Sequence, residues 1–113
     1  MSSQSNLNII LEKVIELYNM VYKDELVNIY LYGSCARGDS TDDSDIDVVA
    51  IVNGERLELQ NKLKDIWDQT AEMELDYDVI ISPTVIPKDE FDKYKAVLPF
   101  YRNIEMEGVP LNV

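Results

Sequence analysis

Two aspartates stand at the head of an apolar run in the segment DIDVVAIV, residues 45–52, and they constrain the fold more than any other feature. The β-branched run is typical of a buried strand. Because side chains alternate across a strand, Asp45 and Asp47 share one face, opposite Ile46. Two carboxylates about 5–7 Å apart and partly buried repel by on the order of a few kcal/mol, and a divalent cation between them reverses the sign of that interaction. The pair therefore predicts a metal site.

The chain divides into segments of helical and strand period, with no repeat, linker or low-complexity tract between them. Apolar residues recur at helical spacing in some segments, and β-branched or aromatic runs ended by glycine or proline predict strands in others. The elements expected in chain order are helix 5–22, strand 27–32, strand 45–52, helix 55–71, strand 75–82, helix 88–95 and helix 99–107. With a short helix after Gly33, and with the last two helices counted together, the order α-β-α-β-α-β-α predicts a single α/β domain over residues 1–113, with helices on one sheet.

Each long helix carries one apolar face, which is most simply the side that packs on the sheet. The expected core positions are Ile10, Val14, Leu17, Tyr18 and Val21 in the first helix and Leu59, Leu63, Ile66, Trp67 and Thr70 in the second. Tyr18 and Trp67 are accordingly expected to pack in the core rather than to contact a cofactor.

Charge and composition limit the partners of the chain. Its 113 residues include 22 acidic and 10 basic side chains, a net charge of -12, and 46% of them are hydrophobic, as in a globular protein. No direct binding of nucleic acid is expected, because phosphates are bound mainly by Lys and Arg. No apolar run is long enough to span a membrane and the polar start does not resemble a signal peptide, so the cytoplasm is the expected location.

Histidine is absent and Cys35 is the single cysteine, which excludes His-based triads, histidine-ligated zinc and an internal disulfide. Any metal site must be built from oxygen ligands, which favours magnesium, calcium or manganese. Cys35 is best explained as a small residue in a turn, because no histidine is present to act as its base.

The segment LDYDVIIS, residues 75–82, repeats the arrangement of the first acidic strand. Asp76 and Asp78 alternate ahead of an apolar run. If the two strands are neighbours, one of these acids completes an all-oxygen cluster with the first pair. Position alone does not choose between them, although Asp78 lies deeper because apolar residues follow it at once.

A glycine and a serine follow the strand over 27–32, in the stretch YGSCARG. Gly33 allows close backbone approach, and Ser34 is placed to cap a short helix whose free N–H groups bind a phosphate. Arg37 has two roles of equal weight: it contacts the phosphates, or it holds the acidic loop over 39–43. The acids of that loop are otherwise expected to be solvated.

Spacing excludes two other motifs that bind metals or nucleotides. A calcium loop of the EF-hand type begun at Asp43 requires glycine at position 48 and glutamate at position 54, where the chain has Val48 and Gly54. No G-x-x-x-x-G-K-[ST] motif occurs, which excludes a P-loop.

Taken in order, three motifs resemble those of a known family: G-S-x-A-R-G over 33–38, S-D-I-D over 44–47 and the later segment with Asp78. Together they resemble the nucleotidyltransferase superfamily of DNA polymerase β type, and most closely the small bacterial minimal nucleotidyltransferases. The ending FYRNIEMEGVPL, residues 100–111, is similar to the tail of many such proteins, although Met106 stands where many relatives carry a basic residue. The resemblance covers essentially the whole chain.

The resemblance implies a mixed sheet and transfer of a nucleoside monophosphate from a triphosphate, here expected to be ATP, to an acceptor hydroxyl. By the same resemblance, Gly33 and Ser34 hold the triphosphate. Arg37 and Ser44 are further candidates for binding the nucleotide.

The resemblance also implies two Mg2+ ions and a role for each aspartate. Asp45 and Asp47 bridge both metals, while Asp78 binds one metal and helps to deprotonate the acceptor. Asp76 is left as an outer or surface residue.

Larger relatives append a domain that binds the acceptor, and little follows the core here, so another macromolecule is the expected acceptor. Proteins like this are commonly encoded beside a HEPN-domain toxin and act as its antitoxin, some by transferring AMP to a tyrosine of the toxin. Two alternatives stay open. One is a non-catalytic acidic module that neutralises the HEPN ribonuclease by binding, and the other is a small-molecule transferase of the aminoglycoside kind.

Overall fold

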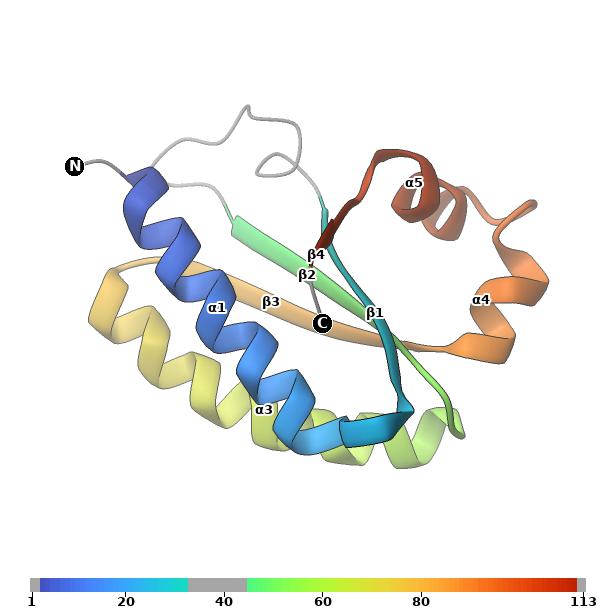
Figure 1. Ribbon diagram of the computed structural model, residues 1–113, viewed down its shortest axis with the longest axis horizontal. Helices are drawn as coiled ribbons and strands as arrows, with labels where there is room; N and C mark the ends of the chain where they lie inside the picture. Colours follow the sequence, from blue (N-terminus) through green and yellow to red (C-terminus); the bar gives the residue numbers. More distant parts are fainter. Residues whose placement is uncertain (1–2, 33–44, 112–113) are drawn as a thin grey trace.

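The computed structural model describes residues 3–32 and 45–111, which form helices on the two sides of one sheet (Figure 1). The helices are α1 (Ser3–Tyr22), the 3-10 turn η1 (Lys23–Glu25), α3 (Arg56–Tyr77), α4 (Lys88–Tyr94) and α5 (Pro99–Glu107). The strands are β1 (Leu26–Tyr32), β2 (Asp45–Val52), β3 (Ile80–Pro87) and β4 (Val109–Leu111). The short helix expected after Gly33 lies outside the described residues. In the described ranges no helix combines the length and apolar composition of a membrane span.

The strands form one sheet in the order β3-β2-β1-β4. β2 pairs antiparallel with β1 and parallel with β3, and β4 pairs antiparallel with β1. The parallel strands are joined through α3, the kind of crossover helix that a parallel connection requires. The sheet is therefore mixed, and the α/β fold with flanking helices is confirmed.

α1 and α3 cover one face of the sheet and bury the larger part of the core (Figure 1). Their buried side chains are Ile10, Leu11, Val14, Tyr18 and Tyr22 from α1 and Leu59, Leu63, Ile66 and Met73 from α3. Leu17 and Val21 are partly buried against them. Except at Trp67, the apolar stripes of the two long helices are core faces, as expected.

The hydroxyl of Tyr18 links α1 to the backbone of the two parallel strands. It donates to the carbonyl oxygen of Thr84 at 2.8 Å and accepts from the Thr84 N–H at 3.1 Å. It also lies 3.4 Å from the carbonyl oxygen of Val48. Burial raises the pKa of Tyr18 far above its usual range, so the hydroxyl stays protonated and keeps its donor.

α4 and α5 cover only part of the opposite face of the sheet (Figure 1). A smaller buried cluster lies beneath them, made of Val49, Ile51, Ile86, Phe91 and Ile104. Along β2 this cover begins at Val49, whereas Asp45 is exposed and Asp47 is half-buried. Among the described elements, α4 and α5 therefore do not cover the start of β2 on this face.

The third strand was placed wrongly by its sequence pattern: it runs from Ile80 to Pro87 and not over 75–82. α3 continues past residue 71 because Met73 and Tyr77 extend its apolar face onto the core. Pro83 does not end the strand, since β3 is at the edge of the sheet, where a residue without an N–H is tolerated.

Trp67 is not a core residue, contrary to expectation. It is 56% exposed, and its Nε1–H donates to the carbonyl oxygen of Pro83 at 3.0 Å. Nearby, the N–H of Ile81 donates to Glu74 Oε2 at 2.8 Å. Side chains of α3 thus satisfy polar groups along the free edge of β3, which would otherwise be open to pairing with another chain.

Candidate active site

Asp45 and Asp47 lie on the face of β2 that α4 and α5 leave open at its start. On the other face, Ile46 and Val48 are 4% and 0% exposed and pack against the core formed with α1 and α3. Val49 continues the row of the two carboxylates and is buried under the second helix layer. Because side chains alternate along a strand, these residues form one row, which begins with two accessible carboxylates and continues with a buried apolar side chain.

Burial and a like charge both act on the Asp47 carboxyl. Desolvation first, and then the charge of Asp45, raise the pKa of Asp47 above its ordinary value. The ionised form is therefore disfavoured in the folded protein, and a cation bound at the pair would favour it again. A carboxyl group perturbed in this way on an accessible face is a candidate functional group.

The strand register places one residue on each side of Asp47. Tyr32 lies opposite it on β1, and Ser82 lies opposite it on β3. Residues paired in this way project from the same face of the sheet, with Cβ atoms about 5 Å apart. The sequence did not single out either residue, because their proximity to Asp47 depends on a register that the pattern along one chain does not reveal.

Asp78 stands at the end of α3, at the edge of the sheet where β2 begins. It is exposed and caps the helix with a left-handed backbone, at φ 54°. It comes two residues before Ile80, which pairs with Asp45 in the parallel register of β2 and β3. Asp78 therefore lies at the same end of the sheet as the aspartate pair. Asp76 lies in the last turn of α3, so the expected alternation of two acids on a strand is wrong.

The structure does not bring Asp45, Asp47 and Asp78 together as a group of three. Over residues 3–32 and 45–111, no three acidic, cysteine or histidine side chains lie near enough to one another to hold a metal ion. Mg2+ usually keeps several waters and takes one or two protein carboxylates together with substrate phosphates. Two adjacent carboxylates on an accessible face fit that ligand set.

The residues predicted to bind the nucleotide lie outside the described part of the chain: Gly33, Ser34, Arg37 and Ser44. Their roles stay predictions. The strands that flank this segment are paired, with Tyr32 opposite Asp47. Tyr32, the last described residue before this segment, therefore lies next to the carboxylate pair.

Comparison with known proteins identifies the family. Residues 7–112 match the family of nucleotidyltransferase domains. Two proteins of Methanocaldococcus jannaschii, each named "Putative protein adenylyltransferase", are similar in sequence. MJ0141 is 37% identical over 81 residues, which cover 66% of this chain and 80% of the relative. MJ0604 is 32% identical over 87 residues, which cover 77% of this chain and 79% of the relative.

The chain belongs to the nucleotidyltransferase family and is an enzyme of that class. Its substrate is accordingly a nucleoside triphosphate, from which it transfers a nucleotidyl group. Enzymes of this family generally use a divalent metal ion, and the carboxylate oxygens of Asp45 and Asp47 are the kind of ligand that such an ion prefers.

Proposed function

We propose that the protein transfers AMP from ATP to a hydroxyl group of a protein partner, with Mg2+ held by Asp45 and Asp47. The carboxylate pair is the observation that carries the proposal. The two acids occupy one face of β2, and the pKa of Asp47 is raised. A like-charge pair of this kind costs stability, and a nucleotidyltransferase has a use for it in binding cations.

Each proposed residue has a separate task in the transfer. Asp45 and Asp47 hold the metal, and Gly33 and Ser34 bind the triphosphate, with Arg37 and Ser44 as further contacts. Mg2+ bound there neutralises charge on the phosphoryl oxygens. The acceptor oxygen bonds to the α-phosphorus as the bond from that phosphorus to pyrophosphate breaks. Asp78, at the same end of the sheet, helps to take the proton from the acceptor hydroxyl.

The choice of AMP and of a protein acceptor is supported by the names of the two relatives, both of which are called protein adenylyltransferases. We propose a HEPN-domain toxin as the acceptor, so that the chain acts as its antitoxin. The net charge of -12 suits a basic partner that binds RNA.

Transfer of label from α-labelled ATP to the candidate partner tests the chemistry. Wild type with Mg2+ should label the partner, and wild type with excess chelator should not. Asp45→Asn and Asp47→Asn should both abolish the label. Asp76→Asn, which removes a carboxylate exposed on the last turn of α3, is the matched control and should label as wild type does. Equal labelling by wild type and Asp47→Asn would refute the proposed metal site.

The acidity of the chain favours a second function, in which it neutralises the toxin by binding alone. The two variants separate this function from the first, because neither changes the bulk of the surface. If Asp45→Asn and Asp47→Asn bind the toxin and still protect cells from it, binding is sufficient. Loss of protection with binding intact supports catalysis.

A further inference from the structure

An aromatic pair lies beside the carboxylates, on the face that α4 and α5 partly cover. The rings of Tyr32 and Phe100 meet edge to face, with centroids 5.6 Å apart and planes at 85°. Because Tyr32 is opposite Asp47 in the pairing of β1 with β2, both side chains project from the same face. The aromatic pair therefore extends the site from β2 towards α5, which lies near the end of β1 (Figure 1).

Phe100 is exposed, although Ile104, one turn later in the same helix, is buried. It is 45% exposed, whereas Ile104 is 0% exposed. A phenyl side chain that is nearly half exposed does not gain the full stabilisation that complete burial would provide. Its free surface is instead available to another planar group, since aromatic rings associate by stacking as well as edge to face.

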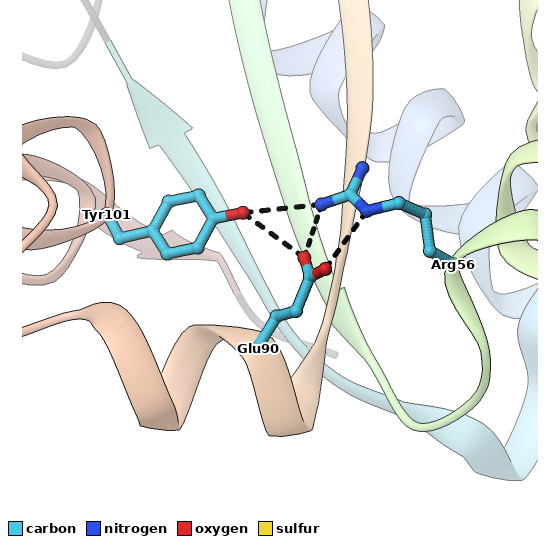
Figure 2. Close-up of polar contacts among 3 residues, drawn as sticks. All are labelled: Arg56, Glu90 and Tyr101. Carbon is cyan, nitrogen blue, oxygen red and sulfur yellow. Dashed lines mark hydrogen bonds and ion pairs between the residues drawn. The ribbon is translucent and has the colours of Figure 1, made fainter.

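A polar network of Arg56, Glu90 and Tyr101 links the first turn of α5 to α3 and α4 (Figure 2). Arg56 of α3 donates from Nε to Glu90 Oε1 at 3.2 Å, and its Nη2 pairs with Glu90 Oε2. The hydroxyl of Tyr101 accepts from Arg56 Nη2 at 3.3 Å and donates to Glu90 Oε2 at 3.3 Å. Because Tyr101 follows Phe100 directly, the network fixes the first turn of α5 to α3 and α4 and so defines the place of the Phe100 ring.

We propose that Phe100, supported by Tyr32, stacks on the base of the bound nucleoside triphosphate. The inference deepens the proposed function and rests on it. A nucleotide has an anionic phosphate end and a planar, uncharged base. This face offers a matching surface for each part. The carboxylates match the phosphate end, because they bind the metal ion that accompanies it, and the aromatic ring matches the base. Stacking tolerates any base and favours the larger purine ring, so purine triphosphates should bind more tightly than pyrimidine triphosphates.

Calorimetric titration of the full chain with two ligands tests the stacking. Both ATP and inorganic tripolyphosphate are titrated in the presence of Mg2+, and only ATP carries a base. Phe100→Ala should weaken ATP binding by roughly 5- to 150-fold, the range for loss of one base–aromatic stack, and leave tripolyphosphate binding unchanged. Phe100→Tyr keeps a ring and should retain the affinity for ATP.

Val97→Ala and Met106→Ala are the matched controls, since both truncate exposed apolar side chains near Phe100 in the chain. Both should bind the two ligands as wild type does. If Phe100→Ala weakens the binding of ATP and of tripolyphosphate equally, or changes neither affinity, the proposed stacking is refuted and the proposed function is not. If Val97→Ala and Phe100→Ala both lose the partner protein while ATP affinity is kept, the surface docks protein and the stacking is again refuted. A wild type that binds neither ligand overturns the proposed function and the stacking with it.

Discussion

The two faces of the sheet carry opposite kinds of residue at the same place on β2. On the face covered by α1 and α3, Ile46 and Val48 are buried in the main core. On the face partly covered by α4 and α5, the row begins with Asp45 and Asp47 and becomes apolar only at Val49. Neighbouring residues of one strand thus belong to a dry core on one side and to an accessible acidic site on the other.

The difference separates the residues that stabilise this protein from those that act on a substrate. The covered face is a continuous apolar layer, in which burial contributes the stabilisation. The open end of the other face holds a carboxyl that ionises less readily than usual, so it lowers stability at neutral pH. A strand can carry such a pair because the covered face keeps it in place.

Ile66→Ala should cause the largest loss of stability. Ile66 is fully buried in α3 against the sheet, so the truncation removes apolar contacts and leaves a cavity. The free energy of unfolding should fall by about 2–5 kcal/mol in urea denaturation, while transfer per folded molecule stays at the wild-type level. Leu57→Ala, on the exposed side of the same helix, is the control and should change little. A similar loss from both variants would contradict the division between the faces.

Asp47→Asn should have the opposite effect to Ile66→Ala, with a loss of transfer activity and no loss of stability. Transfer should fall by about 100-fold or more, because a metal ligand is lost. Stability without metal should not fall, because a like charge leaves a partly buried site. In thermal melts, Mg2+ with ATP should raise the melting temperature of wild type and not that of the variant. A variant that is easier to unfold than wild type would assign the pair a structural role instead.

Asp78→Gly should stabilise the protein by about 0.5–1 kcal/mol. The native residue has a left-handed backbone at φ 54° and places a negative charge at the carboxyl end of α3. Glycine removes both costs. Asp76→Gly, two residues earlier with helical backbone, should instead be neutral or destabilising. Chemical denaturation of the two variants gives the comparison, and a gain at both positions would rule out the backbone explanation.

The smallest expected effect is a pH dependence of stability that Asp47 introduces. Its pKa is raised on folding, so between the unfolded and folded values the native state binds more protons. The free energy of unfolding therefore falls as the pH rises through that window and stays lower above it. The stability of Asp47→Asn relative to wild type should be constant below about pH 3.9 and increase above it. Urea denaturation of both proteins across this range measures the difference, which should not vary if Asp47 titrates normally.

The bounds of β2 and α5 could be predicted from the sequence because local signals mark them. β2 begins at the acidic pair, where side chains alternate between the two faces, and continues as an apolar run rich in β-branched residues. α5 begins at Pro99 and ends before Gly108. The position of Asp45 and Asp47 on one face followed from the same alternation. These are consequences of residues close together in the chain.

The boundary between α3 and β3 could not be predicted in this way. LDYDVIIS has the composition of a strand, yet its first half completes the helix because Tyr77 reaches the core. The helix ends at an aspartate in a left-handed conformation, where the sequence offers no glycine. β4 is only three residues long, and its pairing with β1 is long-range. For the same reason the sequence did not identify Tyr32 and Ser82 as neighbours of Asp47, since their positions depend on the register between strands.

The hydroxyl of Tyr18 has a consequence for how β3 is aligned with β2. It is bonded to Thr84 and lies close to Val48, so sliding one strand along the other would separate a hydroxyl of α1 from its backbone partners inside the core. Such a slip would also move Ser82 away from Asp47. The geometry at the carboxylates is thus locked from the far side of the sheet, by a helix that places no group in the site itself.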